Sequence, residues 1–294
     1  PRQNYTLAVI LGGDGAFSEA VNGMLSRQDK TTIPISHAPG GSGCAVAGNT
    51  IGVWSGSQIE QAVDIIAKQK TKAMDVIEME CSDGVTRYST SCLAGGVNTD
   101  AIDLAEPYRW TYYLFGPTFR YIIGTFKALW KYGTKDTSRI MKYTVKYNDG
   151  KNSNGKEEEE EIFEMETFAF ALYNGGRVMH DTDFAKSATP FSRDMELSIG
   201  RKYEGFGAYL KYLSVLKKEN GDIDFKQYPE LEQVHFKKCH LTSIKVEPVV
   251  DKTPATTRPL TMTLDGEKGW NAEDYTAAPF SARILPGKIQ VVVA

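Results

Sequence analysis

The chain has 294 residues, 41% of them apolar, and a formal net charge of −3 with an isoelectric point near 5.9. It is long enough to bury a core in one large or two modest domains, and its acidity disfavours nucleic acid as a main partner. No uninterrupted apolar run is long enough for a membrane-spanning helix, and four widely spaced cysteines without metal-ligand spacing predict reduced thiols in the cytoplasm.

The first part of the chain alternates strands with helices. An apolar run at 7–11 ends in glycine, which is typical of a strand covered on both faces in a parallel sheet. Apolar residues at helical spacing follow at 17–25, then a second strand at 33–37 and a further helix at 59–70. Residues 1–73 are therefore predicted to form a partial Rossmann-like α/β domain.

From residue 74 onward the chain is rich in strands. The segments concerned alternate in hydropathy or favour β structure, among them MDVIEMEC, TRYSTSCL, MKYTVKYN, FAFALY and KIQVVV. Two helices are predicted to interrupt them, at 112–132 and at 205–219. We expect residues 74–294 to form an antiparallel β-sandwich, so the predicted fold class is α/β followed by β.

The first predicted strand begins almost at the start of the sequence. Only two clear parallel strands precede residue 74, and open parallel sheets normally contain more. We therefore expect residues 7–11 to have at least one unpaired edge, and roughly two or three further strand–helix units to precede Pro1 in the natural protein.

Glycine-rich turns follow both strands of the predicted α/β domain. The first contains Gly12, Gly13 and Gly15, and the second is PGGSG at 39–43. Each turn precedes a helix, and backbone N–H groups at a helix N-terminus bind phosphate. Neighbouring parallel strands end at the same edge of a sheet, so the two turns are expected to lie side by side and to suit a polyphosphate.

Asp14 is unusual in a phosphate-binding turn because its carboxylate would repel a bare phosphate. Either an intervening Mg²⁺ or a role in taking a proton from an attacking hydroxyl would explain it, and both belong to phosphoryl transfer. The alternative is that Asp14 caps the following helix. A dinucleotide fingerprint is incomplete, because Ser18 stands at its last glycine position, and no Walker loop occurs.

Taken together, the motifs resemble those of the diacylglycerol kinase-type lipid kinases, with the eukaryotic sphingosine and ceramide kinases as the most similar branch. They are GGDGAFSEAVNGM, PGGSGCAVAGN, the segment from GGVNTDAIDLAEPYRW to GPTFRYIIGTFKALWKYG, and TLDGE. NAD kinases share the G-G-D-G turn and a following β-rich domain. The second glycine turn and the arginine-bearing helix argue against them.

The resemblance implies a site for ATP and Mg²⁺. It implies that Asp14 is the base for the lipid hydroxyl and that Asp265 holds the metal, although a plain hairpin turn would also explain the D-G-E motif. The nucleotide-binding residues that it implies are Gly12, Gly13, Gly15, Gly41, Ser42, Gly43, Arg109, Arg120 and Glu267.

A lipid site is implied as well. Asp100 or Asp103 resembles the acid that holds the polar head of a sphingoid base. Phe115 and Phe119 belong to the apolar helix that would wall a tunnel for an acyl or alkyl chain, although a buried core helix would show the same pattern.

The implied activity is ATP-dependent phosphorylation of the primary hydroxyl of a sphingoid base, with peripheral and transient association with membranes. Diacylglycerol or ceramide is the alternative substrate. A catalytically silent lipid-binding module is the alternative of another class. It is favoured by Ala16 and Cys44, which stand where the family often has threonine and asparagine, and by the family's opening segment, which is not in this sequence.

Overall fold

A computed structural model provides the structure of the chain. The residues that it describes are 5–41, 43–81, 84–116, 119–134, 139–148, 158–179, 182–201, 206–219, 223–224, 226–232, 235–249, 262–268 and 279–294. Ser42, one of the predicted nucleotide-binding residues, lies outside them.

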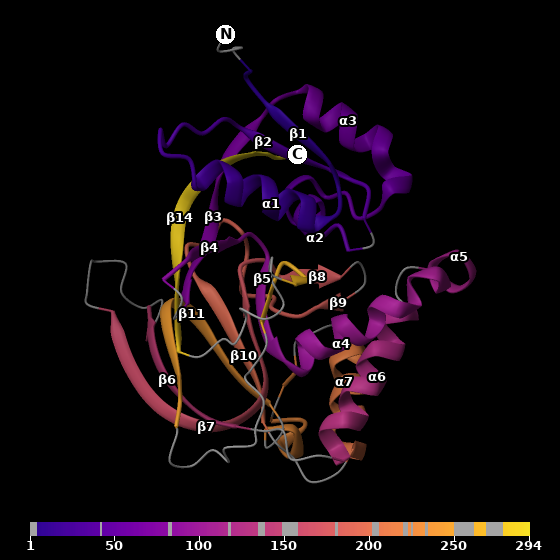
Figure 1. The fold of residues 1–294 in the computed structure, drawn as a ribbon, viewed down its shortest axis with the longest axis vertical. Coiled ribbons are helices and arrows are strands. Elements are labelled where there is room, and N and C mark those ends of the chain that lie inside the picture. The colour runs from indigo at the N-terminus through magenta and orange to yellow at the C-terminus, as the bar shows by residue number, and fades with distance from the viewer. Residues whose placement is uncertain are drawn as a thin grey trace.

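The N-terminal part is an α/β layer built on two parallel strands. β1 (Ala8–Gly12) pairs with β2 (Ile35–Pro39) in parallel register, from Ala8 opposite Ile35 to Gly12 opposite Pro39. The helices beside them are α1 (Asp14–Leu25), α2 (Ala45–Ile51) and α3 (Ile59–Ala67), with the 3₁₀ turn η1 (Gly56–Gln58) before α3 (Figure 1).

Both faces of β2 are covered, but only one face of β1 is. Ile35 belongs to a core cluster with Phe17 of α1, whereas Ala38 packs in a second cluster with residues of α2 and α3. On β1, Val9 and Leu11 are 48% and 72% exposed. The prediction that the first strand is covered on both faces is therefore wrong. An apolar run shows that a strand can be buried on both faces, but it does not show which neighbouring elements cover those faces.

Among the described residues, β1 pairs with β2 alone, so the expected unpaired edge is present. The other side of β2 meets β14 (Phe280–Val292), through the parallel pair Val291 and Ile35. β14 also pairs antiparallel with β3 (Thr71–Cys81) along most of its length. Figure 1 shows these two strands running together from the α/β layer into the large sheet below it.

The remaining strands form a mostly antiparallel sheet, in the order β14-β11-β10-β7-β5-β12-β13. Their bounds are β4 (Thr86–Ser89), β5 (Cys92–Gly96), β6 (Arg139–Tyr147), β7 (Glu159–Tyr173), β10 (Met195–Arg201), β11 (His235–Pro248), β12 (Met262–Leu264) and β13 (Glu267–Lys268). A separate small pair consists of β8 (Arg177–Met179) and β9 (Thr182–Asp183).

The long strands β7 and β11 each change partners along their length. One half of each pairs with β6 and the other half with β10. The strands thereby wrap around one apolar core, in which Tyr143, Phe170 and Leu197 are fully or almost fully buried. The predicted fold class, an α/β part followed by an antiparallel β part, is confirmed.

Helices cover one side of the large sheet (Figure 1). They are α4 (Val97–Ala105), η2 (Glu106–Thr111), α5 (Tyr112–Phe115), α6 (Phe119–Thr134) and α7 (Phe206–Lys218), and η3 (Pro229–Leu231) precedes β11. The predicted helix 112–132 is thus wrong in one respect. It ends at Gly116, whose φ of +83° leaves the helical region, and resumes as α6. The predicted helix 205–219 is confirmed as α7.

Candidate active site

The two glycine turns pack directly on each other at the carboxyl ends of β1 and β2. The backbone N–H of Gly40 donates to the carbonyl of Gly12 at 2.8 Å. A Cβ on Gly41 would lie 2.5 Å from the Cα of Gly13, closer than any real side chain approaches. The expected neighbourhood of the turns is confirmed, and glycine is required at position 41 because only backbone fits there.

Asp14 is the first residue of α1, but its carboxylate accepts a hydrogen bond from α2. Gly13 occupies the N-cap position of α1 and makes no side-chain capping bond. Asp14 Oδ1 instead accepts a hydrogen bond of 3.0 Å from the backbone N–H of Val46, in the first turn of α2. The alternative that Asp14 caps its own helix is wrong. The carboxylate joins the two turns.

The surroundings of Asp14 favour a carboxyl group that can take up a proton. Burial raises the pKa of Asp14, while the hydrogen bond from Val46 and the attraction of His37 lower it, and the charge of Asp265 raises it again. The side chain is 12% exposed, so water reaches it only at one edge. A carboxyl with a raised pKa is a better proton acceptor than an ordinary one.

Asp265 lies in the turn between β12 and β13, in the left-handed region with φ of +53°. Its carboxylate accepts from Ser89 Oγ (2.7 Å), Thr90 N and Oγ1 (2.9 Å each), Ser91 N (2.8 Å) and Cys92 N (3.0 Å). A carboxylate offers about four lone-pair sites, so these donors saturate it.

The saturated carboxylate does not fit a metal ligand, the role that the resemblance implies for Asp265. It fits a structural link between the β12–β13 turn and the segment 89–92. Among the described residues, no group of three His, Cys, Asp or Glu side chains could hold a metal ion. Glu267, the other acid of the motif, lies in β13.

The other residues predicted to bind the nucleotide lie in several elements. Gly15 is buried in α1 and Gly43 lies just before α2. Arg109 of η2 and Arg120 of α6 converge on Glu106, at 2.6 Å and 3.8 Å from its carboxylate oxygens. Arg109 is 65% exposed whereas Arg120 is 15% exposed. The structure therefore brings the two arginines together.

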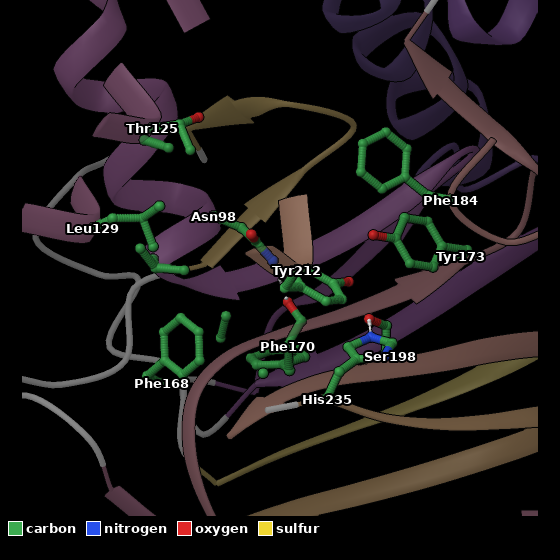
Figure 2. Close-up of a pocket in the computed structure, with 14 residues that line it drawn as sticks. Asn98, Thr125, Leu129, Phe168, Phe170, Tyr173, Phe184, Ser198, Tyr212 and His235 are labelled. Carbon is green, nitrogen blue, oxygen red and sulfur yellow. Dashed lines mark hydrogen bonds between the residues drawn. The ribbon is translucent and has the colours of Figure 1, made fainter. Parts of the chain in front are cut away.

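A cavity of about 120 Å³ lies between the helices and the large sheet (Figure 2). Its lining comes from α4, α6, α7, β7, β10, β11 and the residue after β9: Val97, Asn98, Ala101, Thr125, Leu129, Phe168, Ala169, Phe170, Tyr173, Phe184, Ser198, Gly200, Tyr212 and His235. The lining is mostly apolar, as a site for a hydrocarbon chain requires.

The four residues predicted for the lipid all lie outside this lining. Asp100 of α4 is paired with Lys131 of α6 at 2.6 Å, and Asp103 lies on the same helix as Asp100. The rings of Phe115 and Phe119 pack on each other with centroids 4.6 Å apart, and Phe115 is 61% exposed.

Sequence reasoning missed the polar residues of the cavity. Ser198 Oγ and His235 Nε2 are 2.6 Å apart, and the ring of Tyr212 lies 5.0 Å from that of His235 (Figure 2). Burial lowers the pKa of His235 to about 3, so the ring is neutral near pH 7. A signal was present in β10, because the small Ser198 and Gly200 alternate with the large buried Leu197 and Ile199.

The segment that binds the Asp265 carboxylate also borders the cavity. Tyr173, in the cavity wall, pairs with Cys92 across the sheet. The N–H of Cys92 donates to Asp265, whose charge contributes to the raised pKa of Asp14. Asp265 is thus connected to the cavity wall through Cys92 and acts on Asp14 through its charge.

Comparison with known proteins places these features in a family context. Residues 1–79 match the diacylglycerol kinase catalytic domain. Sphingosine kinase 1 of Mus musculus is 27% identical over 136 residues, which are 43% of this chain and 34% of the mouse protein. Ceramide kinase of Homo sapiens is 30% identical over 121 residues, 36% of this chain and 22% of the human protein.

The matched part spans only 16% to 34% of the length of the curated relatives. The fold extends further than the sequence similarity. A candidate diacylglycerol kinase from Bacillus anthracis str. Sterne superposes with a TM-score of 0.65 at 18% identity. That superposition covers 99% of this chain and 78% of the bacterial one.

Proposed function

We propose that the chain is a lipid kinase of the diacylglycerol kinase type and that it transfers the γ-phosphoryl group of ATP to the primary hydroxyl of a sphingoid base. The observation that carries the proposal is the buried carboxylate of Asp14 between two glycine turns that fit together backbone to backbone. In the reaction, the lipid oxygen bonds to the γ-phosphorus while the bond to the β-phosphate oxygen breaks. The hydroxyl proton passes to Asp14.

The glycine turns account for the nucleotide. Backbone N–H groups at the start of α1, next to Gly12, Gly13 and Gly41, offer donors to phosphate oxygens, and the glycines themselves add no side chain there. Arg109 and Arg120 supply positive charge that offsets the charge of the transferred group. When bound, ATP supplies the phosphoryl group. We infer that the nucleotide binds within 1–73 and the lipid within 74–294.

The cavity supports a site for part of the lipid chain. Its apolar walls would take a segment of a hydrocarbon tail, and Tyr173 in its wall pairs with Cys92, whose N–H donates to Asp265. A sphingoid amine would meet Asp100 only by displacing Lys131, whereas ceramide and diacylglycerol need no acid. We propose a sphingoid base because the matched relatives include a sphingoid long-chain bases kinase and two sphingosine kinases besides the ceramide kinase.

Substrate delivery from a membrane surface is supported by one stripe of exposed side chains. Ile122, Phe126 and Trp130 follow each other at four-residue spacing on α6 and are 60%, 51% and 59% exposed. Further exposed apolar side chains precede them at Trp110, Leu114 and Phe115. Lys127, exposed on the same helix, carries charge that would meet anionic lipid headgroups.

Within the described part of the chain, no helix is long and apolar enough to cross a bilayer. The exposed apolar side chains lead us to propose that α5 and α6 lie on the membrane surface while a lipid enters the cavity.

The direct test compares the chain with its Asp14→Asn variant in assays with ATP and sphingosine, ceramide or diacylglycerol. Asparagine keeps an oxygen to accept from Val46 but cannot take up a proton, so kcat is expected to fall by about 10²- to 10⁴-fold with folding unchanged. Asp29→Asn, in an exposed pair with Arg27, is the matched control. Wild-type kcat in Asp14→Asn would overturn the proposal. Lipid binding without ATP-dependent phosphorylation would favour the silent module.

A further inference from the structure

We propose that His37 is a positioning residue for Asp14, whose buried imidazole orients the carboxylate and shares the proton that the carboxylate takes from the substrate hydroxyl. The inference rests on the proposed function in one respect only, the assignment of Asp14 as the base.

The ring of His37 is held in one orientation behind the active-site turn. Its side chain is fully buried on β2, and Nε2 lies 2.9 Å from the carbonyl oxygen of Gly12. A carbonyl can only accept, so Nε2 carries the hydrogen and Nδ1 is left as the lone-pair nitrogen of the neutral ring. The ring of Phe17, 5.4 Å away, limits its rotation.

Nδ1 is the atom that needs an explanation. Among the described residues it has no hydrogen-bond partner, although it is buried. It lies 3.8 Å from Asp14 Oδ1. A buried polar atom without a partner costs free energy and is therefore a feature to be accounted for. A small rotation of the Asp14 carboxyl group would close the distance to a hydrogen bond.

The charges around Asp14 give this contact its effect. Among the described residues, the charges of two titratable groups act on it, His37 from β2 and Asp265 from the turn after β12, while Asp14 itself raises the pKa of the Cys44 thiol just before α2. Of these groups, His37 is the one that can carry a positive charge. The same Gly12 carbonyl accepts hydrogen bonds from Gly40 and from His37. The acceptor that joins the two glycine turns therefore also fixes the orientation of the imidazole.

The proton balance of the step is simple. The hydroxyl proton moves to Asp14 as the new bond to phosphorus forms. It is then shared with His37 Nδ1, as a carboxylate and an imidazolium, until it leaves with product release. Without His37, the protonated carboxyl group would stand alone next to Asp265.

A titration that needs neither ATP nor lipid tests the contact. In the full chain with ¹³C-labelled aspartate, the midpoint of the Asp14 carboxyl signal is compared between the wild type and His37→Gln. Glutamine can keep the bond to Gly12 but offers no titratable group to Asp14. Because an imidazolium lowers the pKa of a neighbouring carboxyl group, the midpoint is expected to rise by about one pH unit. A midpoint unchanged within about 0.2 unit would overturn the proposal.

His240→Asn is the matched control. His240 forms an exposed pair with Asp194 at 2.6 Å, and asparagine tolerates its positive φ of 61°. This variant should leave the Asp14 signal unmoved. If His37→Gln does not fold, the wild type alone provides the test. The ¹⁵N signals of the His37 ring must then show that Nε2 carries a hydrogen and that the Nδ1 signal changes over the same pH range as the Asp14 carboxyl signal. Titration of Nδ1 independently of Asp14 would overturn the proposal.

Kinetics supply the second readout. In His37→Gln the acidic limb of the kcat/KM profile should move upward by the same pH interval, with KM for ATP and lipid unchanged. An activity loss equal at every pH would mark a merely structural residue and overturn the proposal. A wild type in which Asp14 and His37 titrate together as expected, but which has no kinase activity, would refute the proposed function. It would leave the proposed interaction between the two residues intact.

Discussion

At the scale of single residues, the glycine turns tolerate no added side chain at their contact. Gly41→Ala would place a methyl group 2.5 Å from the Gly13 backbone, which cannot move without displacing Asp14. We expect a loss of roughly 1 to 3 kcal/mol of unfolding free energy, as for other overpacked sites, together with loss of nucleotide binding. Urea denaturation and nucleotide titration measure the two effects.

Gly23→Ala is the control for that change. Gly23 lies inside α1 with no atom within 4 Å of the added Cβ, so alanine should stabilise the chain by about 0.5 to 1 kcal/mol. Equal effects of the two substitutions would refute the argument from packing.

The sequence predicts the position of Asp14 better than its contacts. A glycine-rich turn before a helix is a local pattern, so Gly12, Gly13 and Asp14 can be found without a structure. The bond from Val46 comes from a residue 32 positions away, and the donors to Asp265 lie 173 to 176 positions away. No local pattern contains such contacts, which is why the saturated state of Asp265 could not be foreseen.

At the scale of elements, α6 presents two different faces. Ala128 and Leu129 are buried against the rest of the protein, whereas Ile122, Phe126 and Trp130 are exposed. A helix with apolar residues all round can be buried in a core or can expose one apolar face. The sequence pattern is the same in both cases, so it could not show which applies to α6. The break at Gly116 was equally hidden, because a glycine inside an apolar helix is often tolerated.

The exposed face of α6 yields a test of membrane association. Ile122→Gln should weaken binding to vesicles that contain anionic lipid, measured by co-sedimentation, by roughly 10- to 150-fold, since a buried isoleucine contributes roughly 1.5 to 3 kcal/mol. Ile162→Gln is the matched control, because Ile162 is 57% exposed on β7, away from the helices. Equal losses for both variants would contradict a membrane face on α6.

At the scale of the whole molecule, the cavity depends on helices and strands that are far apart in the sequence. Val97, Leu129, Ser198 and His235 come from four different elements and meet only in the folded chain. The fold class could be predicted, because strand and helix periodicities are local. The cavity could not, because it is defined by how those elements pack.

His235 makes global stability depend on pH. Its pKa is about 3 in the folded state and near 6.5 in the unfolded chain, so the unfolded state binds more protons between these values. Stability is therefore full above pH 6.5 and lost as the pH falls toward 3. By pH 5 the free energy of unfolding is lower by roughly 2 kcal/mol, which is measured as a lower urea midpoint than at pH 7.5. His235→Asn should make the free energy of unfolding less dependent on pH. An unchanged pH dependence in this variant would refute the role of His235.

The parallel contact between β2 and β14 also has a consequence for how the protein is made. Ile35 leaves the ribosome long before Val291, yet the two strands are neighbours in one sheet. Domains near the start of a nascent chain usually fold first. Here β14, the second neighbour of β2, is synthesised only after the large sheet, so β2 and the glycine turn that follows it gain this neighbour late in synthesis.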